Sequence, residues 1–285
     1  MELEVITPSY APDFELCRDL NESVRRHGAD RVRHTIIVPP RDLELFAPLE
    51  GERSSVRSVD EYLSGLIRMP RNYWFNPHRP LVPVRGWIAQ QIVKLEAAAR
   101  SQSDMVVMVD SDIVFVRDFG AETFRAANGT PEFYRCEGAI DERLPRHIIW
   151  HSVARRMLGL GENPSLPLAD YVCCPCGWEP MVVRSLLAEV ERHGRARWQR
   201  IVGAQLHFSE MILYGVYVDH SRSDADARTI VSDMHCHRHY DEIPLDESGL
   251  RAFLAEIRPI DHSVMISAKS GTPLALRREA LASLG

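Results

Sequence analysis

The stretch Val106-Val107-Met108-Val109-Asp110-Ser111-Asp112-Ile113-Val114-Phe115 decides the fold that we expect for this chain. The apolar run from Met105 to Val109 has the length of a strand, and both of its faces must be covered, as in a mainly parallel sheet. Two carboxylates, Asp110 and Asp112, follow it directly. Ligands of open α/β sheets bind beyond the carboxyl ends of the strands. We therefore expect a ligand site at this acidic pair.

Strand-like and helix-like segments alternate before this stretch, which predicts an α/β fold with crossover helices and a mostly parallel, twisted sheet. We expect strands at 4–7, 35–38 and 55–58, helices at 13–27, 59–67 and 85–100, and an ordered loop at 69–84. The second half predicts helices at 143–158, 179–194 and 198–217, a strand at 229–231 and a final helix at 249–257. No repeat or linker interrupts the chain, so one domain over 1–285 is the simplest interpretation.

The composition is that of an ordinary globular enzyme, with 285 residues of which 45% are hydrophobic and 26% charged. A net charge of −6 and a pI near 6.1 argue against a nucleic-acid binder, which needs a basic face. The first ten residues lack the pattern of a leader, and the apolar runs are too short for a membrane span. We expect a cytoplasmic protein whose six cysteines are reduced thiols.

The acidic pair predicts a metal site. Mg²⁺ and Mn²⁺ take oxygen ligands, and they commonly bridge one or two carboxylates to substrate phosphates. A strand that ends in solvated acids would give the same triplet by chance. The apolar residues on both sides, up to Val109 and from Ile113, favour the functional interpretation, because two exposed acids would lie awkwardly beside a core.

This arrangement resembles the DxD motif of GT-A glycosyltransferases, the nucleotide-diphospho-sugar transferases of bacteria among them. Three further stretches are similar to that family: Val5-Ile6-Thr7-Pro8-Ser9-Tyr10, 85–95, and Ser209-Glu210-Met211-Ile212-Leu213-Tyr214-Gly215. The resemblance implies a GT-A (Rossmann-like) fold, with a nucleotide-sugar half at 1–130 and an acceptor half at 131–285. It also implies a nucleoside-diphosphate-sugar donor and transfer to a hydroxyl or amine of a small soluble acceptor.

The expected donor site combines the residues that match the family with nearby basic side chains that suit a base or a diphosphate. It comprises Thr7, Pro8, Ser9, Tyr10, Arg57, Arg85, Gln91, Lys94, Asp110 and Ser111.

A histidine at the end of a late strand would complete the metal site if the resemblance holds. Alternation along an extended chain puts His235, His237 and His239 on one side. We expect Asp110, Asp112 and one histidine as ligands, His237 before His235. Surface histidines beside a turn are the alternative.

Glu210 is the expected general base of an inverting transfer, because a poorly solvated carboxylate in an apolar helix is a good proton acceptor. Trp178, at a loop–helix junction, and Tyr214 are expected on the acceptor side. Cys173 and Cys176 have the spacing of a zinc or redox pair, but no second pair follows, so buried structural thiols are the first interpretation.

Other functions remain open at this stage. The triplet also fits haloacid-dehalogenase-type phosphatases, with Asp110 as nucleophile and Asp112 as acid/base. That fold normally opens with its nucleophile strand, whereas about a third of this chain precedes Asp110. A nucleotide-sugar binder without activity and a nucleotidyltransferase are further alternatives; the latter usually carries a Gly-rich N-terminal loop, which is absent from 7–12.

Overall fold

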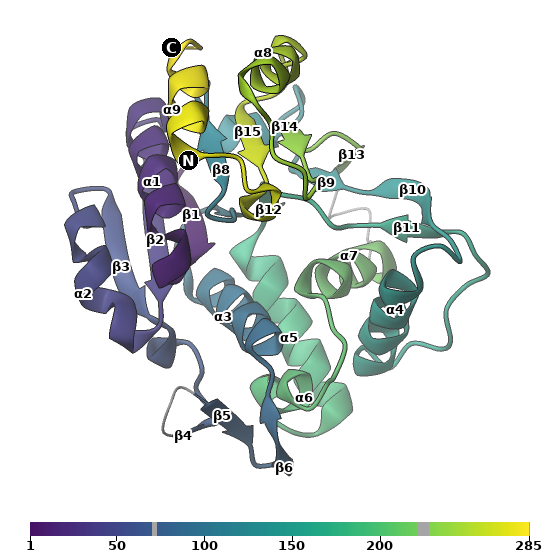
Figure 1. Cartoon of the computed structure of the whole chain (residues 1–285). Helices are drawn as coiled ribbons and strands as arrows, with labels where there is room; N and C mark the ends of the chain where they lie inside the picture. Colours follow the sequence, from purple (N-terminus) through teal and green to yellow (C-terminus); the bar gives the residue numbers. More distant parts are fainter. Residues whose placement is uncertain (70–72, 222–227, 285) are drawn as a thin grey trace.

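The computed structural model describes residues 1–69, 73–221 and 228–284, and its centre is a five-stranded sheet (Figure 1). The strand order is β12-β7-β1-β2-β3, with β1 (Leu3–Pro8), β2 (Val32–Val38), β3 (Ser54–Ser58), β7 (Met105–Met108) and β12 (Cys176–Trp178). Four of these strands are parallel, and β12 runs antiparallel to β7. The predicted α/β class with a mostly parallel sheet is confirmed.

Helices cover both faces of this sheet because its strands are apolar on both sides. In β1, Val5 belongs to the core that contains Leu20 of α1 (Phe14–His27). The next residue, Ile6, belongs to the opposite core, with Ile92 of α3 (Gly86–Arg100). That second core also holds α5 (Pro180–Gly194) and α7 (Glu210–His220), which lie near α3 in Figure 1. The period-two alternation of β1 therefore separates the two layers.

A second sheet, in the order β14-β15-β8, continues from the acidic pair. It contains β8 (Ile113–Phe115), β14 (Cys236–His239) and β15 (Ser263–Ile266), and α8 (Glu247–Ala255) packs on it. The chain ends in α9 (Leu274–Ala282), which lies beside α1 (Figure 1), where Arg278 pairs with Glu15 at 2.8 Å. The prediction that 249–257 is the final helix is wrong, since β15 and α9 follow it.

Residues 59–84 differ most from the prediction. The expected helix at 59–67 is a single 3-10 turn, Val59–Glu61, and β4 (Ile67–Met69) begins after it. The expected loop at 69–84 holds β5 (Tyr73–Asn76) and β6 (Arg79–Val84), which complete a three-stranded antiparallel sheet. The two prolines of β6 are tolerated because it is an edge strand. Residues 70–72 lie outside the described residues.

The predicted helix at 198–217 is two helices, α6 (Trp198–Gly203) and α7. α7 starts at Glu210 because the Ser209 side chain accepts a hydrogen bond from the Ile212 N–H, an N-cap. The remaining elements are α2 (Leu43–Phe46), α4 (Pro145–Met157) and two small sheets, which pair β9 (Glu132–Tyr134) with β13 (Thr229–Val231) and β10 (Cys136–Ile140) with β11 (Leu168–Asp170). No helix in the described parts of the chain is long and apolar enough to cross a membrane.

Candidate active site

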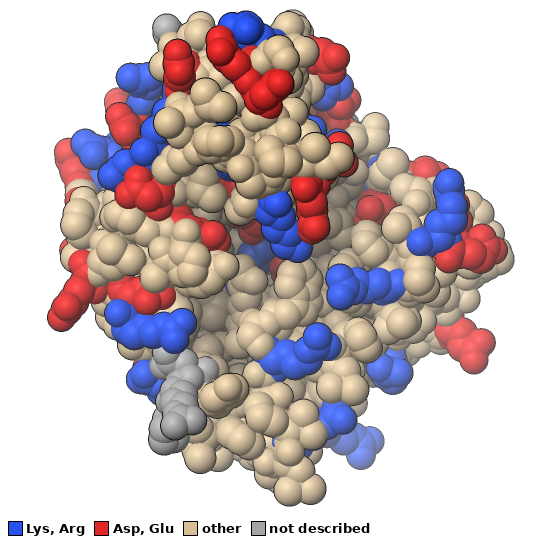
Figure 2. Space-filling model, in the orientation of Figure 1, with Lys and Arg blue, Asp and Glu red and all other residues tan. Residues whose placement is uncertain are grey.

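A cleft of about 280 Å³ opens beside the carboxyl ends of β1 and β7. Figure 2 shows the molecule hollowed over the upper part of α3, with acidic and basic side chains along the upper edge of the hollow. The cleft is lined by Pro8, Asp13, Trp87, Gln90, Lys94, Asp110, Ser111, Asp112, Trp150, Val172, Cys173, Cys174, Ser209, Glu210, Met211, Tyr240, Met265 and Ala268. Both residues of the acidic pair, Asp110 and Asp112, thus line one cavity.

Lys94 occupies the centre of the charged part of the cleft. Its Nζ lies 3.2 Å from Oδ1 of Asp110 and 3.4 Å from Oε1 of Glu210. The side chains of Lys94 and Glu210 are buried, whereas that of Asp110 is 46% exposed. Burial alone lowers the pKa of Lys94, but the carboxylates of Asp110 and Glu210 outweigh this and hold it above its ordinary value. The lysine is therefore a permanent cation between two acids.

A hydrogen bond of the Glu210 backbone fixes the position of this residue. Its N–H, at the start of α7, donates a hydrogen bond of 2.9 Å to Oε1 of Gln91, and the Gln91 amide donates in turn to the carbonyl of Trp87 at 3.2 Å. A buried glutamine of α3 thereby satisfies a free N–H in the first turn of α7. The position of Glu210 relative to Lys94 follows from this helix–helix contact.

Asp112 is held on one oxygen and free on the other. Oδ2 accepts a hydrogen bond of 2.8 Å from the N–H of Ala268, while the buried Oδ1 has no hydrogen-bond partner among the described residues. Burial raises the pKa of Asp112, and the charge of Asp110 adds to the shift. An unpartnered buried carboxylate oxygen is unfavourable by itself, so it suits a site that a cation fills.

The loop that carries Ala268 is held by Arg277. This buried guanidinium donates to the carbonyls of Ile266 at 2.8 Å, Ser267 at 2.8 Å and Thr272 at 3.1 Å. The C-terminal segment thus contributes to the position of Asp112.

The predicted histidine ligands are not brought to the cleft. The ring of His237 stacks on Phe253 of α8 at 4.2 Å, and its buried Nε2 has no hydrogen-bond partner in the part of the chain that the structure describes. His235 contacts Oε2 of Glu132 through Nε2 at 2.6 Å. Alternation along β14 turns His237 and His239 toward Phe253, on the α8 side of the sheet. His235 precedes the strand and has a left-handed backbone conformation, with φ of 55°, so it does not follow this alternation.

Two carboxylates remain for a metal ion. Within the described residues, no group of three or more His, Cys, Asp or Glu side chains could hold one. Asp112, with its unpartnered Oδ1, and the half-exposed Asp110 fit a divalent cation that binds together with a phosphate group.

The expected donor residues are divided by the fold. Pro8, Lys94, Asp110 and Ser111 line the cleft, and Ser9 lies directly beneath, where its hydroxyl accepts a hydrogen bond from Ser111 at 2.9 Å. The others lie outside the cleft. Thr7 is buried and contacts His34 at 2.9 Å, and Gln91 accepts the hydrogen bond of the Glu210 N–H. Tyr10 and Arg57 are exposed, and Arg85 donates to the carbonyl of Leu206 at 3.0 Å.

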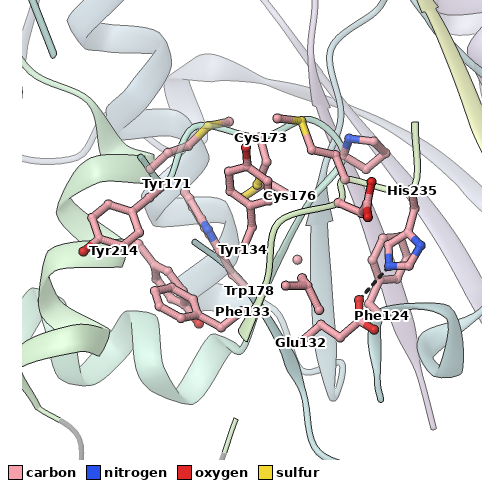
Figure 3. Close-up of a pocket in the computed structure, with 16 residues that line it drawn as sticks. Phe124, Glu132, Phe133, Tyr134, Tyr171, Cys173, Cys176, Trp178, Tyr214 and His235 are labelled. Carbon is pink, nitrogen blue, oxygen red and sulfur yellow. Dashed lines mark hydrogen bonds and ion pairs between the residues drawn. The ribbon is translucent and has the colours of Figure 1, made fainter. Parts of the chain in front are cut away.

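Trp178 and Tyr214 do not line the cleft. Their rings stack at 5.1 Å in a neighbouring aromatic cavity of about 30 Å³ (Figure 3), which shares Cys173 and Met211 with the cleft. That volume holds no more than a few water molecules. Cys173 and Cys176 line the same cavity, and burial raises the pKa of Cys173. All six cysteines are free thiols.

The prediction missed several lining residues. Trp87 and Gln90 are two of them. Together with Lys94, which was predicted, they follow one another at intervals of three and four along α3, so the three residues share one face of the helix. That periodicity was a usable signal. It indicates that Gln90, and not the predicted Gln91, lines the cleft. Tyr240, Met265 and Ala268 carry no local signal, because tertiary contacts alone bring them to the cleft.

Comparison with known families places the chain. A family model described as "Family of unknown function (DUF6492)" matches residues 3–246. The chain belongs to the DUF6492 family. The match to DUF6492 contains the cleft residues from Pro8 to Tyr240. It ends before the loop of Ala268, whose N–H donates a hydrogen bond to Asp112.

Two other comparisons add little. No curated protein matches the sequence. Among solved structures, the chain is similar to an active-site mutant of LgtC. That similarity has 12% identity and a TM-score of 0.45, and it covers 99% of this chain and 94% of LgtC. At this distance we draw no functional argument from it.

Proposed function

We propose that this DUF6492 chain is a metal-dependent glycosyltransferase of the GT-A type, which transfers a sugar from a nucleoside-diphosphate donor to a hydroxyl or amine of an acceptor. The observation that carries the proposal is the joint presence, in one cleft, of the Lys94 ion pairs and the unpartnered Oδ1 of Asp112. The cleft lies beyond the carboxyl ends of parallel strands, where α/β enzymes bind nucleotides.

The acidic side of the cleft suits the diphosphate. Asp112 and Asp110 would hold Mg²⁺ or Mn²⁺ on it, and this ion would neutralise charge that develops on the leaving group. Lys94 adds a fixed positive charge, and it holds Asp110 in place through the contact at 3.2 Å. Preorganised charges of this kind stabilise a developing anion without any reorganisation.

Glu210 suits the proton transfer. It is the buried carboxylate that lines the cleft, and its contact with Lys94 keeps it in one orientation. In the proposed step, the acceptor oxygen forms a bond to the anomeric carbon and its proton passes to Glu210. The bond between that carbon and the diphosphate oxygen breaks, and the electron pair leaves with the diphosphate.

The proposal is tested by thermal shift with UDP, GDP, dTDP, ADP and CDP, each with and without Mn²⁺. We expect one diphosphate to stabilise the wild type in the presence of metal and to lose this effect in Asp112→Asn. The amide keeps the shape of the side chain but lacks its charge. Glu44→Gln, at an exposed position of α2 outside the cleft, is the matched control and should behave as wild type.

Two results would contradict the proposal. One is the absence of any metal-dependent shift with the five nucleotides. The other is stabilisation by beryllium fluoride, a mimic of an aspartyl phosphate, which would favour the phosphatase chemistry of Asp110. Hydrolysis of the donor that is lost in Glu210→Gln while nucleotide binding persists would support the assigned role of Glu210.

A further inference from the structure

One tryptophan of this chain is exposed. The chain contains five tryptophans. Four of them are buried, with 8% or less of their surface exposed, whereas Trp87 has 51% exposed and lines the cleft. An exposed indole is a large apolar surface left in contact with water, and in a cleft it commonly contacts a ligand.

The indole of Trp87 is held rigidly. Its Nε1 donates a hydrogen bond of 3.1 Å to the carbonyl of Phe208. Its ring packs in an offset stack on Trp150, with centroids 6.3 Å apart and planes inclined by 16°. Trp150 stacks in turn on His147 at 4.6 Å. A ring fixed in this way loses little conformational freedom when a ligand covers it.

The Trp87 ring lies on the side of the cleft that holds Glu210, the proposed general base, rather than on the side of Asp110 and Asp112. Phe208, its hydrogen-bond partner, lies two residues before Glu210, and the Trp87 carbonyl accepts from Gln91, which holds the Glu210 N–H. A general base must lie within hydrogen-bond reach of the proton that it accepts. A ligand stacked on Trp87 beside Glu210 therefore takes the place of the acceptor, not of the nucleotide.

The polar surroundings indicate the class of ligand. Gln90 lies one helical turn after Trp87 on the same face of α3, and its amide makes no hydrogen bond to any described residue. A pyranose ring has an apolar C–H face, which packs on an aromatic ring, and hydroxyl groups at its edge, which require donors and acceptors. The indole, the amide and the carboxylate together match these requirements.

We infer that Trp87 and Gln90 form an acceptor subsite for a pyranose, so that the acceptor of this enzyme is a carbohydrate. This inference rests on the proposed function, and it replaces Trp178, which is buried, with Trp87 as the aromatic platform.

The test uses the intrinsic fluorescence of the full chain, because Trp87 is its one exposed tryptophan; Trp150 also lines the cleft, but it is buried. The probes are methyl β-glucoside, methyl β-galactoside, methyl α-mannoside, cellobiose and maltose, with and without the nucleoside diphosphate that binds. We expect at least one saccharide to change the emission and to protect it from acrylamide. Titration calorimetry measures saccharide binding in Trp87→Ala, because the reporting indole is absent from this variant. There the saccharide should bind about tenfold more weakly than to wild type, while the nucleotide-induced thermal shift stays as in wild type.

Trp198→Phe, at a buried tryptophan outside the cleft, is the matched control and should retain the saccharide response. If Trp87→Ala loses the nucleotide shift instead, the indole binds the nucleobase and the inference is wrong. It is also wrong if none of the saccharides changes the emission of wild type. Failure of the glycosyltransferase proposal is recognised separately, since it appears as the absence of a nucleotide shift in wild type.

Discussion

Nζ of Lys94 lies 3.4 Å from Oε1 of Glu210, and the side chains of both residues are buried. The contact joins the middle of α3 to the first turn of α7, so a charge pair and a helix–helix interface coincide. The same ammonium also faces Asp110 at 3.2 Å. Removal of either partner consequently affects both stability and the arrangement of the cleft.

Lys94→Met should destabilise the protein by about 3–5 kcal/mol, because it leaves the buried Glu210 carboxylate without its counter-charge. Adding Glu210→Gln should recover part of this loss, since the double variant has no unpaired charge there. Urea unfolding of the two single variants and of the double variant measures the coupling. Strictly additive effects would show that the contact does not stabilise the fold.

Arg277→Lys should weaken metal-dependent nucleotide binding about tenfold, because lysine cannot supply the planar fork of donors that holds the loop carrying Ala268. Hydrogen exchange of 267–272 should become faster in this variant. Arg278→Lys is the control. Arg278 pairs with Asp19 and Glu15 at the surface, so its replacement should leave nucleotide binding intact. If both variants weakened nucleotide binding equally, the position of Asp112 would not explain the effect of Arg277→Lys.

His34 should make stability fall in mild acid. Burial lowers its pKa from 6.5 to about 3, while its ring nitrogens contact Asn21 and Thr7. Below about pH 6.5 the His34 imidazole binds a proton in the unfolded chain but stays neutral in the folded chain. The free energy of unfolding therefore decreases by about 1.4 kcal/mol per pH unit as the pH falls toward 3. Above that range the contribution is complete.

The measurement for His34 is urea unfolding from about pH 7 to about pH 4.5, in wild type and in His34→Asn. The variant should be less stable at neutral pH, but it should lose less stability on acidification. Parallel curves for the two proteins would show that His34 is not responsible.

Gly215→Ala should destabilise the protein by about 3 kcal/mol, although alanine is the better helix former. A Cβ atom at this position of α7 would overlap the ring of Tyr171. Gly51→Ala, where a Cβ meets nothing within 4 Å, is the control and should change the melting temperature little. A neutral Gly215→Ala would mean that α7 and Tyr171 separate easily.

Much of the fold is readable because its signals are local. The apolar runs around Val5, Ile36 and Val107 are buried strands in any tertiary context, and α1 and α3 follow from helical periodicity. Residues 59–84 were misjudged for the opposite reason. The Tyr-Trp-Phe segment becomes a strand because it pairs with β4 and β6, and no local propensity dictates that pairing.

The sequence by itself determined the α/β class and the acidic pair after β7, because hydrophobic periodicity and a strand-ending Asp-Ser-Asp are properties of neighbouring residues. Only the tertiary structure decided which side chains join that pair. It brought Lys94, Glu210 and Ala268 to the cleft, turned His237 toward α8 and buried Trp178. These outcomes depend on contacts between segments far apart in the chain, and such contacts are set by packing rather than by sequence spacing.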